Sequence, residues 1–99
     1  MASLKPNLTV VTASGIATAR RIADALDVPL HGRPDGADAP VDNLGAHLRE
    51  RFIGGTPIVF VGALGALVRL LATVISDKAE DPAVVAVAED GGAVIPVLG

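Results

Sequence analysis

Cysteine is missing from all 99 residues, which excludes disulfide frameworks, thiolate nucleophiles and thiolate metal ligands. A chain without cysteine suits a reducing compartment, and we expect a cytoplasmic protein. The first residues, Met-Ala-Ser-Leu-Lys-Pro, also lack the apolar segment of a signal peptide, so no export signal is predicted.

Aromatic residues and positive charge are scarce as well. Only Phe52 and Phe60 are aromatic, and the formal net charge is −3. Because there is no aromatic platform and no basic cluster, we do not expect the chain to bind nucleic acid. The chain is instead rich in aliphatic residues: 51% of it is hydrophobic and its mean hydropathy is +0.54. Residues 1–99 are therefore expected to form a single domain around an aliphatic core.

One long hydrophobic run extends from Pro57 to Ile75 and approaches the length that spans a membrane. In a bilayer Arg69 would lie deep in this run, at a cost of about 2.5–3.5 kcal/mol. Gly62 and Gly65 also divide the run into a strand-length and a helix-length piece. We therefore expect a strand, a glycine turn and a helix, with no membrane contact.

Apolar runs and turn signals alternate along the chain in the order β-α-β-α-β-α-β-β. Strands are expected over residues 8–12, 28–30, 57–61, 83–88 and 93–98, and helices over 16–26, 44–53 and 66–75. This order predicts a three-layer α/β/α sandwich with a mostly parallel sheet and a C-terminal β-hairpin edge that turns at Glu89–Gly92. Ser14 and Asn43 are the expected N-caps of the first two helices. The segment Gly32–Asn43 is expected to be a mobile surface loop rather than a lid.

Two turns are candidates for ligand binding, because both would follow parallel strands at one edge of the sheet. They contain Ser14 and Gly15 in the first turn, and Gly62, Ala63 and Gly65 in the second. Free backbone N–H groups at such turns attract anions or carboxylates. The alternative, which the pattern leaves open, is that the glycines only allow strand and helix to pack closely. The spacing matches neither a P-loop nor a complete dinucleotide fingerprint, so a phosphate-binding module is a weaker possibility.

Arg69 is the single charge inside the apolar helix. A buried guanidinium without a partner is too costly, so this side chain must reach solvent, a carboxylate or a ligand. Lys78 and Asp81 follow in the connection to the next strand, which Pro82 begins. Asp77, Glu80 and Asp81 are possible partners of Arg69, and the structural and functional interpretations both remain open.

No catalytic residue can be assigned from the pattern. His31 and His47 are the only histidines, and neither stands in a metal-binding or nucleophile-activating arrangement. We therefore expect no metal site and no cofactor of the chain's own.

The run from Val61 to Leu98 resembles the N-terminal domain of the CbiG family of cobalamin biosynthesis. The resemblance rests on a Gly-Ala-x-Gly-x-x-Val-Arg segment and a Lys-x-x-Asp-Pro-Ala-Val-Val segment. Matching positions are Gly62, Ala63, Gly65, Val68, Arg69, Ala72, Lys78, Asp81, Pro82, Ala83, Val84, Val85, Val87, Glu89, Gly91, Val94, Ile95 and Leu98. Thr73 and Ala88 depart from the family pattern, where a proline and an aspartate are usual, and a Gly-His-x-Gly-Gly-Ala-Asn segment would follow Gly99. The chain is therefore expected to be one domain of a longer protein.

The resemblance implies a role in making the corrin ring of vitamin B12. The family enzyme opens the δ-lactone of cobalt-precorrin-5A and releases acetaldehyde, a hydrolytic carbon–carbon cleavage that needs a base. Cobalt would arrive in the substrate, whose acetate and propionate arms need carboxylate receivers. The candidate substrate-binding residues are Ser14, Gly15, Gly62, Ala63, Gly65, Arg69, Lys78 and Asp81. The alternative is a non-catalytic corrinoid-binding or docking domain that is fused to, or partners, another cobalamin-pathway enzyme such as a precorrin methyltransferase.

Overall fold

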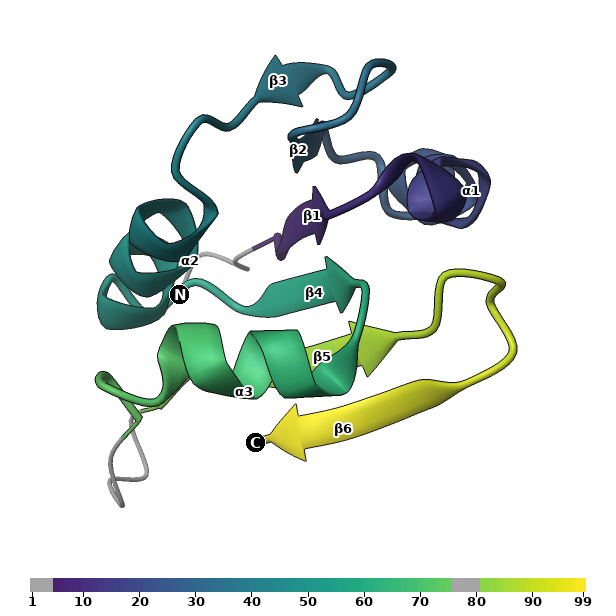
Figure 1. The fold of residues 1–99 in the computed structure, drawn as a ribbon. Coiled ribbons are helices and arrows are strands. Elements are labelled where there is room, and N and C mark those ends of the chain that lie inside the picture. Colours follow the sequence, from purple (N-terminus) through teal and green to yellow (C-terminus); the bar gives the residue numbers. More distant parts are fainter. Residues whose placement is uncertain (1–4, 76–80) are drawn as a thin grey trace.

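A six-stranded sheet forms the middle of the molecule in the computed structural model, which describes residues 5–75 and 81–99 (Figure 1). The spatial order of its strands is β3-β2-β1-β4-β5-β6. The strands are β1 (Asn7–Val10), β2 (Leu30–Gly32), β3 (Ala39–Pro40), β4 (Ile58–Val61), β5 (Val84–Val87) and β6 (Val94–Leu98). The first five run parallel and β6 pairs antiparallel with β5. The predicted parallel sheet with a hairpin edge is confirmed.

Helices cover both faces of the sheet, which confirms the three layers. They are α1 (Ile16–Leu26), α2 (Leu44–Ile53) and α3 (Leu64–Leu71), with a short 3-10 turn, η1 (Ala13–Gly15), before α1. Figure 1 shows α1 on one side of the sheet, and α2 and α3 on the other. Each βα connection between neighbouring parallel strands thus returns over the sheet as a crossover.

Two hydrophobic cores lie on the two faces of the sheet, because side chains alternate along each strand. In β4, Ile58 and Phe60 point toward α2 and α3, and Val61 points toward α1. Phe60 is fully buried, and apart from Phe52 every other apolar residue of the two cores is aliphatic. Among the described residues, no helix is both long and apolar enough to cross a membrane.

The segment Gly32–Asn43 is more ordered than predicted. Its residues Ala39 and Pro40 form β3, which pairs in parallel with β2. Asp38 holds the segment in place, since its Oδ2 accepts from the Leu30 N–H at 2.8 Å and both its oxygens accept from Arg20. Proline is tolerated there because β3 is an edge strand. The segment is therefore not a loop throughout, because it contributes a two-residue edge strand that the sequence did not predict.

The helix N-termini test three local predictions. Asn43 caps α2 as predicted, and its Oδ1 accepts from the Ala46 N–H at 2.9 Å. Ser14 does not cap α1, because it lies inside η1 and the N-cap position falls on Gly15. The third helix begins at Leu64, two residues before the predicted Ala66, so Gly65 lies in its first turn.

Candidate functional site

The carboxyl ends of β1 and β4 lie side by side, with Val10 opposite Val61. The chain leaves β1 for α1 on one face of the sheet and leaves β4 for α3 on the other. Divergence of two neighbouring connections opens a crevice at the carboxyl edge of an α/β sheet, the usual place for a ligand. The two turns predicted from the sequence therefore do lie on one rim.

Gly15 and Gly62 are at positions without room for a side chain. A Cβ on Gly15 would lie 3.0 Å from Cγ1 of Val61, and one on Gly62 would lie 2.9 Å from Cγ2 of Val11. Both glycines are buried and bring the turns close to the strand ends. Their direct effect is close packing, which is the structural alternative that the sequence left open.

The turn from Gly62 to Leu64 leads into α3 without a side-chain cap. Ala63 is the N-cap residue, and its carbonyl accepts from the N–H groups of Ala66 and Leu67 at 3.1 and 3.2 Å. The N–H groups of Leu64 and Gly65 precede these and have no carbonyl within the helix to bond. Ala63, Leu64 and Gly65 are all exposed, so the positive end of the helix faces solvent at the rim.

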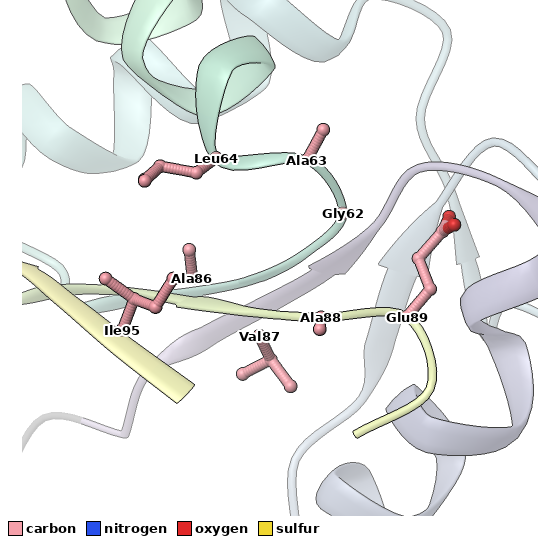
Figure 2. A pocket seen from close by; sticks show the side chains of 8 residues that line it. All are labelled: Gly62, Ala63, Leu64, Ala86, Val87, Ala88, Glu89 and Ile95. Atoms are coloured by element: carbon pink, nitrogen blue, oxygen red, sulfur yellow. The ribbon is translucent and has the colours of Figure 1, made fainter. Parts of the chain in front are cut away.

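A pocket of about 280 Å³ lies beneath this turn. Its walls are the turn itself, the carboxyl end of β5 and one residue of β6: Gly62, Ala63, Leu64, Ala86, Val87, Ala88, Glu89 and Ile95. Figure 2 shows Leu64 and Ile95 on one side and the carboxylate of Glu89 at the other end. The pocket therefore combines an apolar wall with a single acidic group among its described lining residues.

Glu89 is the functional candidate that sequence reasoning did not include in the site. Its carboxylate accepts a hydrogen bond from the Thr12 hydroxyl, which follows β1, and its carbonyl accepts from the Thr18 hydroxyl at 2.6 Å. These bonds tie the β5–β6 connection to the start of α1. Its place directly after a parallel strand was a signal in the sequence, but the residue was interpreted as part of the hairpin turn.

The hairpin itself is as predicted. The Ala88 N–H donates to the carbonyl of Ala93 at 2.9 Å, and Gly91 adopts a positive φ of 79°. Glycine is the residue that adopts this conformation without strain. Because the turn is tight, Glu89 stays at the carboxyl edge of the sheet.

The remaining predicted residues lie apart from this rim or outside the description. Asp81 precedes β5 at the amino edge, since the neighbouring Ala83 carbonyl accepts from the N–H of Ile58, the first residue of β4. Lys78 lies outside the described residues. The structure thus brings Ser14, Gly15, Gly62, Ala63 and Gly65 to one edge, and places Asp81 at the other.

Arg69 lies in the last turn of α3 and is exposed, so the expected problem of a buried guanidinium does not arise. Helical side chains lean toward the N-terminus of their helix. Accordingly, a Cβ on Gly65 would lie 3.9 Å from a terminal nitrogen of Arg69. The glycine leaves space in which the guanidinium approaches the first turn of α3.

Within residues 5–75 and 81–99, no three histidine, cysteine or acidic side chains converge as a metal site would require. Fold and rim together define a small α/β domain with a pocket at the carboxyl edge of its sheet. The family model for the N-terminal domain of cobalamin synthesis protein G matches residues 46–99. The chain belongs to this family.

Two known proteins are similar over nearly the whole chain. Cobalt-precorrin-5A hydrolase of Salmonella typhimurium is 37% identical over 106 aligned residues, which cover 99% of this chain and 30% of that protein. A crystal structure assigned as a cobalamin biosynthesis protein G homologue from Sulfolobus solfataricus shares the fold, with a TM-score of 0.61 and 22% identity. It is matched over 97% of this chain and 30% of its own length. The chain therefore spans about a third of the length of the relatives that it matches.

Proposed function

We propose that this chain is the N-terminal, substrate-binding part of a cobalt-precorrin-5A hydrolase and acts in the cytoplasm. The observation that supports this most directly is the crevice at the carboxyl edge, where an uncapped helix N-terminus and an apolar pocket lie together. A corrinoid has the matching chemistry: an apolar macrocycle with carboxylate arms around it. The similarity to the Salmonella enzyme supports the choice of substrate.

The carboxylate arms would be received by backbone N–H groups and by Arg69. The N–H groups of Leu64 and Gly65 point from the positive end of α3, and hydrogen bonds to an ionised carboxylate there are among the stronger ones in proteins. The guanidinium of Arg69 lies against the same turn. With a net charge of −3 the chain does not attract a polyanion from a distance, so these groups act locally.

Glu89 is the chain's own candidate for a base. Opening of a lactone consumes water, and a carboxylate beside the reacting carbonyl can take the proton of that water. The Thr12 hydroxyl holds this carboxylate at the pocket. We propose that the domain needs no cofactor of its own, because cobalt belongs to the substrate, and that the remaining two thirds of such an enzyme supply the rest of the catalytic site.

The test is an equilibrium titration of the 99-residue chain with a free-carboxylate corrinoid, followed by visible absorbance. Saturable binding is expected. The substitution Gly65→Glu places a negative charge in the first turn of α3, and we expect it to weaken binding about tenfold or more. Arg69→Ala is expected to weaken binding roughly two- to fivefold without unfolding the domain, because the side chain is exposed.

The matched control is Ile53→Glu, which adds the same charge at a residue that is 72% exposed at the end of α2. It is expected to bind as the parent chain does. Equal weakening by Ile53→Glu and Gly65→Glu would mean that only net charge matters and would contradict a site at the carboxyl edge. Absence of binding to the folded parent chain would leave the domain a docking role.

A further inference from the structure

A second pocket, of about 250 Å³, opens at the opposite edge of the sheet, where β1 and β2 begin. Its described lining contains three cationic or protonatable side chains and two neutral polar ones, together with Asp27 at the mouth. The lining residues are Lys5, Pro6, Asn7, Asp27, Val28, Pro29, His31, Arg51 and Thr56. No part of the proposed substrate crevice contributes to it, since strands of four residues separate the two edges by roughly 10–13 Å.

A buried polar network backs this pocket on the α2 face of the sheet. The side chain of Asn7, only 6% exposed, accepts from the Thr9 hydroxyl at 2.7 Å and contacts Nε2 of His47 at 3.1 Å. Its amide nitrogen lies 3.3 Å from Nδ1 of His31. With the amide donating, His31 accepts at Nδ1 and carries its proton on Nε2 when neutral. On this face of β1, the buried positions are therefore occupied by two hydrogen-bonded polar residues, Asn7 and Thr9, and not by apolar ones.

Arg51 is the member of this cluster with an unsatisfied side-chain nitrogen among the described residues. It follows His47 by one turn of α2, and its Nε is buried without a hydrogen-bond partner among the described residues. A buried N–H that bonds nothing in the protein costs about 1–3 kcal/mol, more for a charged group. Arg51 also lines the pocket, where a small acceptor could reach the guanidinium.

We propose that this amino-edge pocket binds a small oxyanion, a carboxylate or a phosphate, between Arg51, His31 and Lys5. The planar guanidinium suits an oxyanion because two of its N–H groups can bond two oxygens at once. Lys5 now donates to the Asp27 carbonyl at 3.0 Å, and its side chain is 61% exposed. It can therefore turn toward an anion in the pocket without breaking any buried contact.

The electrostatics of the cluster couple this binding to protonation. Burial lowers the pKa of both His31 and His47, and the positive charge of Arg51 lowers them further. An anion beside Arg51 opposes that charge, so it would raise the pKa of His31, and by linkage a lower pH would tighten anion binding. The charged groups around the two imidazoles are Lys5, Asp27, Asp38, Glu50 and Arg51.

The experiment is a titration of the ¹⁵N-labelled chain with inorganic phosphate, then acetate, then a free-carboxylate corrinoid, at constant ionic strength. The signals to follow are the Arg51 Nε–H and the imidazole nitrogens of His31 and His47. We expect saturable shifts of these signals, with an affinity that increases as the pH is lowered from 7.5 to 6. Arg51→Gln is expected to weaken binding about tenfold or more. Arg33→Gln removes the same charge from an exposed position and is the control, with no change expected.

If Arg51→Gln does not fold, Lys5→Gln serves instead, because Lys5 is exposed, and it is expected to weaken binding severalfold. Saturation by phosphate or acetate identifies a free anion as the ligand, and saturation by the corrinoid alone identifies a carboxylate arm. Shifts that stay linear for all three ligands, or that are equal in Arg51→Gln and Arg33→Gln, would overturn the proposal. The proposed substrate site is judged separately, by signals of Ala63, Gly65 and Glu89.

Discussion

Single glycines at the carboxyl edge have two different physical roles. Gly15 and Gly62 are buried and leave no space for a Cβ, so they determine how closely the turns approach the strand ends. Gly65 is exposed, and among the described residues only the end of the Arg69 side chain would lie within 4 Å of a Cβ added there. At Gly65 the absent side chain keeps the helix N-terminus open, which is what an anion there requires.

These roles predict opposite effects on stability. Gly15→Ala forces a methyl group to 3.0 Å from Val61 and 3.1 Å from Val10, and should lower the free energy of unfolding by about 1–3 kcal/mol. Gly65→Ala adds a better helix former in open space and should raise it by about 0.5–1 kcal/mol. Urea unfolding measures both. Equal changes in the free energy of unfolding for the two substitutions would contradict the claim that Gly15 is required by packing and Gly65 is not.

Substitution of Glu89 is expected to change the affinity for a corrinoid in the opposite direction to substitution of Arg69. Glu89→Gln keeps the shape of the side chain and a hydrogen-bond acceptor for the Thr12 hydroxyl, but removes a negative charge from the pocket. The binding of a polyanionic corrinoid should become roughly two- to fivefold tighter. The same titration measures this, with Glu50→Gln at an exposed position of α2 as the control. Weaker binding of Glu89→Gln would mean that the carboxylate receives the substrate directly.

At the scale of elements, the periodicity of apolar residues predicts where helices and strands lie, but it does not predict how a helix end is capped or how a connection is held. Asn43 caps α2 through the Ala46 N–H, the bond that its position in the sequence predicted. Asn43→Ala should lower the free energy of unfolding by about 1 kcal/mol. Asn43→Asp retains an acceptor and suits the helix dipole, so it should unfold as the parent chain does. A loss of the same size in both variants would show that the cap contributes nothing.

The segment between β2 and α2 depends on Asp38. Hydrogen bonds from Arg20 and then from the Leu30 N–H hold the pKa of this carboxyl below its ordinary value of 3.8. Because the pKa is lower in the folded state, the stabilisation is fully present above about 3.8 and is lost as pH falls through the folded value.

Asp38→Asn should therefore lower the melting temperature at pH 7, and its difference from the parent chain should shrink as the pH falls below about 3.8. Asp35→Asn, on the same segment and exposed, is the control for a lost carboxylate. Melting curves from pH 7 to pH 2.5 measure both. A difference for Asp38→Asn that stays constant over this range would rule out its ionisation as the cause.

At the scale of the whole molecule, alternating apolar runs were sufficient to predict the mostly parallel sheet and its hairpin edge, but not the two-residue strand β3. Position along a strand also predicted that the Gly15 and Gly62 turns share a rim. Partners distant in the sequence could not be predicted. The bond between Thr12 and Glu89 joins residues 77 positions apart, and Asp38 orders its segment through Arg20, 18 positions away. The exposure of Arg69 depends on which face of α3 packs on the sheet. Because Arg69 has apolar neighbours on both sides in the sequence, that face could not be predicted.

The most direct test of the central claim is to map a bound free-carboxylate corrinoid on the ¹⁵N-labelled chain by amide chemical shifts. We predict that the largest changes fall at the carboxyl edge, on Ser14, Gly15, Ala63, Gly65 and Glu89, with Asp81 unaffected. Changes that fall on Asp81 and the amino edge alone, or an unchanged spectrum at saturating corrinoid, would contradict the assignment of the substrate site.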